Sequence, residues 1–188
     1  MIHLAEQSAI THDMTETTET IWTIGHSNRS FDDFALTLQE ARIELVADVR
    51  RFPGSRRLPQ FESDALRASL ERCDIAYRWI PALGGRRRPS PDSVNTAWTH
   101  PAFRAYADHA FSEEFAEGLM ELLMLAGGLR TAIMCAEVLW WRCHRRLIAD
   151  VLVSLDVQVI HLFGKGKREP HRLAPPAWLD VIVGPGAH

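Results

Sequence analysis

The chain has 188 residues, a length that fits one domain with a single hydrophobic core and room for a pocket. It carries 21 basic and 24 acidic residues, a net charge of -3, and no apolar run reaches the roughly 18 residues of a membrane helix, which excludes a membrane-spanning protein. Three cysteines, an odd number, and an N-terminus without a signal-peptide pattern favour a soluble cytoplasmic protein with reduced thiols over a secreted disulfide framework.

Residues 1–19 hold four acidic residues and no Lys or Arg, and we expect them to form a disordered acidic leader. The rest of the chain is nearly neutral, with 21 basic and 20 acidic residues, and 19 of the basic residues are arginines. The planar guanidinium holds phosphate or carboxylate at two points, so this bias favours anion binding. A genome rich in G and C would produce the same bias.

The first half of the chain alternates short apolar runs with amphipathic segments. A β-rich run at 20–26 precedes a helix over 31–42, with Ser30 as N-cap and Asp33 at the capping-box position. A second buried strand is predicted at 43–50, a loop at 51–61, a helix at 63–73 and a third strand at 75–83. The span 84–100 is irregular.

In the second half, two helices are predicted at 101–110 and 112–126, the second capped by Ser112 and ended by Gly127 and Gly128. A strand at 130–137, a helix at 143–155 and a strand at 157–164 follow. This alternation predicts an α/β fold, a single domain over 20–172 with a mostly parallel sheet of about five strands and helices on both faces, in a Rossmann-like three-layer arrangement. The Pro-rich end, 173–188, is expected to be a wrapping tail.

In open parallel sheets, ligands bind beyond the carboxyl ends of the strands. The segments after the first four predicted strands are "GHSNRS", "DVRRFPGSRR", "LGGRRRPSPDS" and "CAEVLWWRCHRR". We therefore expect the polar and reactive side chains to meet at one edge of the sheet.

The helix expected to begin near Cys143 carries arginines where the helix dipole disfavours cations, namely Arg145 and Arg146, with Arg142 just before them. Free N–H groups and guanidinium groups together make a good site for phosphate. The alternative is that these arginines bend outward to meet acidic side chains.

Four arginines crowd the loop after the second strand, among them Arg50, Arg51 and Arg57, and Ser55 lies between them. Such a loop resembles a clamp for phosphate or carboxylate. Asp48 would orient an arginine or act as a base. Alternatively, Asp48 only pairs with a neighbouring arginine and holds the loop.

Cys135 and Glu137 lie on the same side of the fourth strand, where that side opens onto the expected pocket. A thiol near arginines and a helix N-terminus has a lowered pKa, which would make Cys135 a nucleophile. The alternative is a buried thiol that packs as a small apolar group. The spacing Cys-x6-Arg from Cys135 to Arg142 does not fit the Cys-x5-Arg loop of a phosphatase.

Zinc ligation is a further possibility for Cys135, Cys143 and His144, with Glu137 or His26 as a fourth ligand. The paired short spacings of structural zinc sites are absent, so the sequence assigns no metal ligand.

His26 and Ser27, at the end of the first strand, are candidates for acid-base chemistry and hydrogen bonding, and so is His144. A histidine bonded to backbone is an equally good interpretation. The span 84–100 contains Arg86 and resembles a binding loop, or else a solvated one. Tryptophans at 98, 140 and 141 would stack on a base, or else pack.

Five segments in this order resemble the bacterial and archaeal family known as domain of unknown function 488. They are Gly25 to Ser27, Asp48 to Arg50 with Pro53 and Ser55, Leu83 to Gly85, Cys135 to Glu137, and Cys143 to Arg145. The resemblance covers about residues 20 to 172, and it implies an α/β fold with a polar site built from these segments but no particular activity. The linking segment "VLWWR" departs from the charged, proline-containing link of many members.

The leading interpretation is an enzyme, a hydrolase or transferase, acting on a phosphate-bearing small molecule or a nucleic acid. The alternatives are a non-catalytic nucleic-acid-binding module and a zinc-stabilised structural domain. No cofactor or oligomeric state is specified by the sequence, and no membrane partner is expected. Candidates for catalysis are Cys135, Glu137, Asp48, His26 and His144; candidates for anion or substrate binding are Ser27, Arg50, Arg51, Ser55, Arg57, Arg86, Arg142, Cys143 and Arg145.

Overall fold

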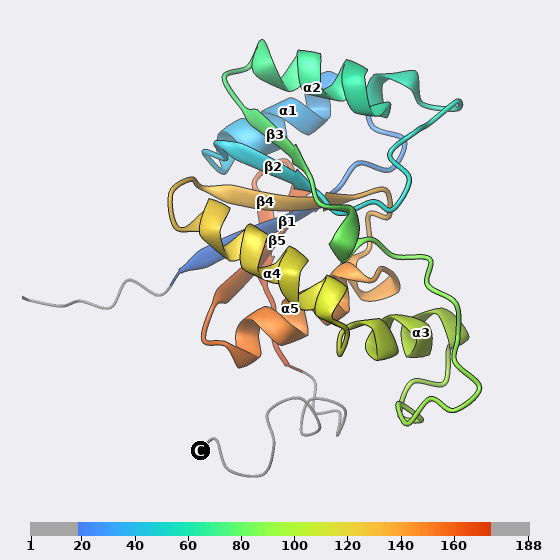
Figure 1. The fold of residues 1–188 in the computed structure, drawn as a ribbon. Coiled ribbons are helices and arrows are strands. Elements are labelled where there is room, and N and C mark those ends of the chain that lie inside the picture. The colour runs from blue at the N-terminus through green and yellow to red at the C-terminus, as the bar shows by residue number, and fades with distance from the viewer. Residues whose placement is uncertain (1–18, 174–188) are drawn as a thin grey trace, which may run out of the picture.

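A computed structural model describes residues 19–173 as one sheet with helices on both faces (Figure 1). Apart from Glu19 and Leu173, the predicted acidic leader and C-terminal tail lie outside these residues. The strands are β1 (Thr20–Gly25), β2 (Leu45–Asp48), β3 (Ala76–Trp79), β4 (Thr131–Cys135), β5 (Gln158–Gly164) and β6 (Lys167–Pro170), in the order β3-β2-β4-β1-β5-β6. β1 to β5 are parallel and β6 is antiparallel, which confirms the predicted α/β class.

The helices form two layers, one on each face of the sheet (Figure 1). α1 (Phe31–Glu40) and α2 (Ser63–Glu71) cover one face, and α4 (Glu113–Ala126) and α5 (Arg145–Ser154) cover the other. α3 (Pro101–His109) lies beyond the carboxyl ends of the strands. Successive strand residues alternate between the two cores: Met134 packs with Phe34 and Leu66, whereas Ile133 packs with Leu147 and Leu122.

The helix starts follow the capping residues in the sequence. The hydroxyl of Ser30 accepts a hydrogen bond from the N–H of Asp33 at 3.1 Å, and that of Ser112 accepts one from Phe115 at 3.2 Å, so both predicted N-caps are confirmed. α5 begins at Arg145 rather than at Cys143, because Trp140–Arg142 form a 3-10 turn before it.

The sequence did not predict β6, which lies between the last predicted strand and the Pro-rich end. All four residues of β6 are exposed, so no alternation of apolar and polar residues marks it. β5 and β6 are joined by Lys165 and Gly166, both with positive φ (53° and 69°), the conformation of a tight hairpin turn. Within residues 19–173, none of the helices has the length and apolar character needed to cross a bilayer.

β4 lies between β1 and β2, although it follows β3 in the chain. The segments after three neighbouring strands therefore leave the same edge of the sheet side by side. This crossing point of the topology is where ligands bind in sheets of this kind.

Candidate active site

The segments after β1, β2 and β4 are joined through their backbones. The N–H of His26 donates to the carbonyl oxygen of Cys135 at 3.0 Å, and the N–H of Ser27 donates to that of Ala136 at 2.9 Å. On the other side of β4, the N–H of Val49 donates to the carbonyl oxygen of Met134 at 3.0 Å. These bonds continue the sheet past its strands and fix the three segments to one another.

Gly25 permits this close approach. A Cβ atom at this position would lie 2.0 Å from the carbonyl oxygen of Glu137, so any side chain would push the two segments apart. The Gly-His-Ser segment and the Cys-Ala-Glu segment are thus parts of one structural unit.

A pocket of about 620 Å³ opens at this edge of the sheet. Its lining combines reactive groups, guanidinium groups and aromatic rings from segments far apart in the sequence. Among the lining residues are Cys135, Glu137, Cys143 and His144, the arginines Arg51, Arg86 and Arg142, and the aromatic residues Phe52 and Trp141.

The two thiols and the imidazole form one compact group, here called the Cys-Cys-His cluster: Cys135, Cys143 and His144. Nδ1 of His144 lies 3.5 Å from Sγ of Cys143 and 3.9 Å from Sγ of Cys135. All three ligand atoms lie within 4.8 Å of one another. Both cysteines are free thiols and both are buried, whereas His144 is half-buried.

The two thiols of the cluster have pKa values shifted in opposite directions. The hydrogen bond of Cys135 to Cys143, together with burial, raises the pKa of the Cys135 thiol well above its usual value. Burial also raises the pKa of Cys143, but the hydrogen bond from Cys135 and the neighbouring His144 and Arg145 outweigh it and lower this pKa well below its usual value. The prediction of a lowered pKa at Cys135 is therefore wrong, because the lowered pKa of the pair is that of Cys143.

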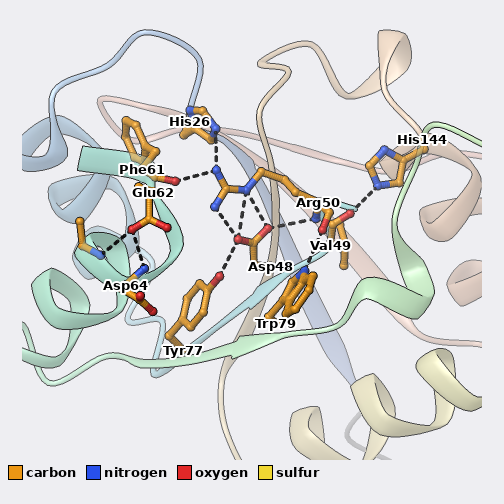
Figure 2. Close-up of polar contacts among 11 residues, drawn as sticks. His26, Asp48, Val49, Arg50, Phe61, Glu62, Asp64, Tyr77, Trp79 and His144 are labelled. Carbon is orange, nitrogen blue, oxygen red and sulfur yellow. Dashed lines mark hydrogen bonds and ion pairs between the residues drawn. The ribbon is translucent and has the colours of Figure 1, made fainter. Parts of the chain in front are cut away.

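The ring of His144 is fixed on three sides. Its Nε2–H donates to the carbonyl oxygen of Val49 at 2.9 Å (Figure 2). The ring of Tyr106 lies 5.0 Å away, centroid to centroid, and the Tyr106 hydroxyl donates to the carbonyl oxygen of Leu83 at 2.7 Å. A Cβ atom at Gly85 would lie 2.8 Å from Nδ1 of His144, so the Leu-Gly-Gly segment leaves room for the imidazole.

Asp48 and Arg50 form a buried ion pair beside the pocket (Figure 2). Nη2 of Arg50 lies 2.6 Å from Oδ2 of Asp48, and this oxygen also accepts a hydrogen bond from the Tyr77 hydroxyl at 2.7 Å. Nη1 of Arg50 donates to the carbonyl oxygen of Phe61 at 2.8 Å. Asp48 is fully buried and pairs with Arg50, as both interpretations of this residue predicted, and a role for Asp48 as a base stays a prediction.

His26 is buried against this ion pair. Its Nδ1–H donates to the carbonyl oxygen of Ser27 at 2.8 Å, which directs Nε2 toward Nη1 of Arg50 at 3.4 Å (Figure 2). The ring stacks on Phe61 with centroids 4.2 Å apart. Burial, with a contribution from Arg50, lowers the pKa of His26 to about 4, so the ring is neutral at pH 7.

Arg145 is also buried, with 1% of its surface exposed, and it does not line the pocket. Its guanidinium donates to the hydroxyl of Thr23 at 3.0 Å, to the carbonyl oxygen of Val138 at 3.2 Å and to that of Glu137. Arg146 instead lies over the ring of Trp98, 4.9 Å from its centroid. The two arginines at the start of α5 thus contact a hydroxyl, carbonyl oxygens and an aromatic ring rather than acidic side chains.

Three further predicted residues lie outside the pocket lining. The Ser55 hydroxyl accepts a hydrogen bond from the N–H of Leu58 at 3.1 Å and so closes a turn of the loop. Arg57 is exposed, and Ser27 is half-exposed with a positive φ of 47°. The structure therefore brings together Arg51, Arg86, Cys135, Glu137, Arg142, Cys143 and His144, with Arg50 and Asp48 as a buried support.

Sequence reasoning missed the aromatic residues that hold the site. Tyr77 bonds Asp48, the indole N–H of Trp79 donates to the carbonyl oxygen of Arg50 at 2.8 Å, and Tyr106 packs on His144. Burial and the nearby carboxylate of Asp48 raise the pKa of Tyr77, so its hydroxyl remains a donor. Tyr77 and Trp79, on β3, show the alternation of a strand, but nothing in the sequence marks their partners.

The fold and the site define an α/β protein with a thiol-containing pocket at the carboxyl edge of its sheet. A model of the family Domain of unknown function DUF488 matches residues 30–152, and the chain belongs to this family. The match contains four of the five segments named above, and Gly25 to Ser27 precede it. Comparisons with curated proteins and with solved structures gave no match.

Proposed function

We propose that the protein is an enzyme, a hydrolase or transferase, that acts on a phosphate-bearing substrate in this pocket. One observation carries the proposal. Arg86 and Arg142 line the pocket with exposed side chains, and among residues 19–173 no hydrogen bond or ion pair engages either guanidinium. Two uncommitted guanidinium groups beside a reactive Cys-Cys-His cluster favour an anionic substrate held over that cluster.

The remaining arginines have other roles. Arg50 and Arg145 are buried and bonded to internal oxygens, so we assign both to the support of the pocket, although Arg50 also lies in its lining. Arg51 lines the pocket, and its guanidinium lies 4.0 Å from a carboxylate oxygen of the exposed Glu114, a weak contact that an anion can replace.

Two exposed aromatic rings favour a nucleotide or a nucleic-acid strand. Phe52 and Trp141 line the same pocket and expose 65% and 42% of their surfaces. Exposed aromatic side chains of this kind stack on nucleobases, at about 1 to 3 kcal/mol per base. Glu137, also exposed in the pocket, supplies a carboxylate for acid-base chemistry.

The proposal is tested with a panel of nucleoside monophosphates, nucleoside triphosphates and short single-stranded oligonucleotides. Binding is followed by calorimetry and turnover by mass spectrometry, for the wild type and for Arg86→Ala and Arg142→Ala. We expect both variants to lose binding and turnover. The matched control is Arg72→Ala, an exposed arginine that bonds only within α2 and its C-terminus, and it should behave as wild type. Unchanged binding in both pocket variants would refute the proposal.

A non-catalytic nucleic-acid-binding module is the rival. Of the tryptophans considered for base stacking, Trp140 stacks on His161 with centroids 4.2 Å apart, and the guanidinium of Arg146 lies over the ring of Trp98. One ring face of each tryptophan is therefore already covered. Oligonucleotide binding that falls steeply with salt, without turnover of any member of the panel, and that Cys143→Ser and Glu137→Gln leave intact, would favour the module over the enzyme.

A further inference from the structure

The Cys-Cys-His cluster has the donor set of a transition-metal site. We propose that Sγ of Cys135, Sγ of Cys143 and Nδ1 of His144 bind one Zn²⁺ ion, with the fourth coordination position facing the pocket. The inference deepens the proposed function and rests on it in one respect, the placement of the ion next to the substrate. Metal binding itself stands on the geometry of the three side chains.

The distances match tetrahedral coordination. With Zn–S bonds of about 2.3 Å and Zn–N bonds of about 2.0 Å, a tetrahedral ion separates S from N by roughly 3.5 Å and S from S by roughly 3.8 Å. The observed S···N distances are 3.5 Å and 3.9 Å, and all three atoms lie within 4.8 Å of one another. The S···N distances need shifts of only a few tenths of an ångström, and the S···S distance at most about 1 Å, so the cluster is close to a complete site.

The orientation of the imidazole is that of a metal ligand. A carbonyl oxygen only accepts hydrogen bonds, so the contact with Val49 places the proton of neutral His144 on Nε2. Nδ1 then carries the lone pair, and this is the nitrogen that faces both sulfurs. Metal-binding histidines usually donate their other N–H to a carbonyl or a carboxylate in the same way.

The burial of the donors sets the side from which an ion enters. Cys135 and Cys143 expose 9% and 5% of their surfaces, and both line the pocket together with His144. Cys135 ends a strand, whereas Cys143 and His144 immediately precede α5, so the site joins two elements that the sequence separates. Entry is from the pocket, where the arginines also lie.

The chemical type of the donor atoms indicates which ion binds, and their number indicates the role of that ion. Two thiolates and one imidazole favour Zn²⁺ over Mg²⁺ or Ca²⁺, which prefer oxygen. Structural zinc sites have four protein ligands, but within residues 19–173 the group holds three donors and no fourth His, Cys, Asp or Glu. Three protein ligands and one exchangeable position are the arrangement of catalytic zinc, where the ion binds water or polarises a substrate oxygen.

The test uses the full chain, reduced and treated with a chelator, then titrated with Co²⁺ as a spectroscopic substitute for Zn²⁺ and with Zn²⁺ in competition. We expect one equivalent of Co²⁺ to give the visible bands of a tetrahedral ion and a thiolate-to-cobalt charge-transfer band. Cys135→Ser, Cys143→Ser and His144→Ala should each weaken binding at least tenfold, an order-of-magnitude expectation for loss of one of three ligands. Cys73→Ser, which removes the third free thiol, is the matched control and should bind as wild type.

Circular dichroism of each variant checks the fold, and Cys143→Ala replaces Cys143→Ser if the serine variant does not fold. Absence of the charge-transfer band in reduced wild type, or unchanged Co²⁺ affinity in both Cys135→Ser and Cys143→Ser, would overturn the metal site. The arginine variants separate the two proposals. Arg86→Ala and Arg142→Ala should bind Co²⁺ as wild type while losing nucleotide binding, and nucleotide binding that they retain would refute the proposed function and leave the metal site standing.

Discussion

The imidazole of His144 donates its Nε2–H to the carbonyl oxygen of Val49 at 2.9 Å, across 95 positions of the sequence. Val49 directly follows β2, and His144 directly precedes α5. The bond therefore connects the loop that carries the buried Arg50 to the helix start that carries Cys143. Because it fixes one ring nitrogen, it also fixes the direction in which the other faces the sulfurs.

Gly85 tests whether this ring position matters. A methyl group at residue 85 would lie 2.8 Å from Nδ1 and 3.1 Å from Cγ of His144, so Gly85→Ala must displace the ring. We expect Co²⁺ affinity to fall about 10- to 100-fold, the usual effect of disturbing the support of a metal ligand, and the free energy of unfolding to fall by about 1 to 3 kcal/mol.

Gly54→Ala is the control for this substitution, because a Cβ atom there meets nothing within 4 Å. Titration with Co²⁺ and urea denaturation should find this variant close to wild type. An equal effect of the two alanines would show that the space beside His144 is unimportant.

The ion pair of Asp48 and Arg50 gives a second prediction. Asp48→Ala leaves the buried guanidinium of Arg50 without its charge partner and without two of its hydrogen-bond acceptors. Loss of one partner from a buried pair costs about 3 to 5 kcal/mol, and we expect a loss of this size in urea denaturation at neutral pH.

The exposed pair of Arg78 and Glu121 provides the comparison for Asp48. Glu121→Ala should change the free energy of unfolding by less than about 1 kcal/mol, since water screens this pair. If Asp48→Ala is as mild as Glu121→Ala, Arg50 is not held as the structure describes.

The position of the site could be predicted from sequence, but the roles of its arginines could not. Reactive residues followed four apolar runs, and parallel strands place such segments at one edge. Arg142 and Arg145 stand three positions apart and differ entirely in environment, one exposed in the pocket and the other buried. What separates them is Thr23, 122 positions from Arg145 in the chain, and a partner so distant leaves no local pattern.

The fold shows the same limit. β1, β2, β4 and β5 were predictable because they are largely apolar runs between amphipathic helices, and β3 because its residues favour strands. The residues of β6 are exposed and take their conformation from pairing with β5. A polar edge strand carries no periodic signal. The metal-ligand geometry was likewise invisible, because Cys135 lies on a strand and its partners lie eight and nine residues later, a spacing that no common zinc motif shares.

Arg145 gives a third prediction, which separates support from anion binding. Arg145→Lys keeps the charge but cannot reach the Thr23 hydroxyl and the carbonyl oxygens of Glu137 and Val138 together. Buried acceptors left unpaired should lower the free energy of unfolding by about 1 to 3 kcal/mol. Arg146→Lys, which changes only a contact with Trp98, should cost at most about 1 kcal/mol by the same urea assay. Equal costs for the two lysines would argue against a supporting role for Arg145.

A buried chain of hydrogen bonds next to Arg145 leads to the last prediction. The Thr23 hydroxyl lies 2.8 Å from Nδ1 of His161, Nε2 of His161 lies 3.0 Å from Nδ1 of His171, and Nε2 of His171 lies 2.8 Å from Oδ1 of Asp150. With both rings neutral, every donor in this chain meets an acceptor. Burial, the largest cause, and the electrostatic effects of the neighbouring His171 and Arg145 lower the pKa of His161 from 6.5 to about 3.

Stability should therefore fall with acid through this residue. Between about pH 6.5 and pH 3 the unfolded chain holds a proton on His161 that the folded chain does not, so the free energy of unfolding decreases as the pH falls, by at most about 1.4 kcal/mol per pH unit. Urea denaturation near neutrality and at about pH 5 measures this slope. His161→Gln should make this slope shallower by up to about 1.4 kcal/mol per pH unit, the contribution of one proton. His100→Asn, which keeps an N-cap on α3 at an exposed position, should leave it unchanged. A slope that His161→Gln does not alter would mean that the acid sensitivity of the fold comes from other groups, such as His26, whose pKa burial also lowers.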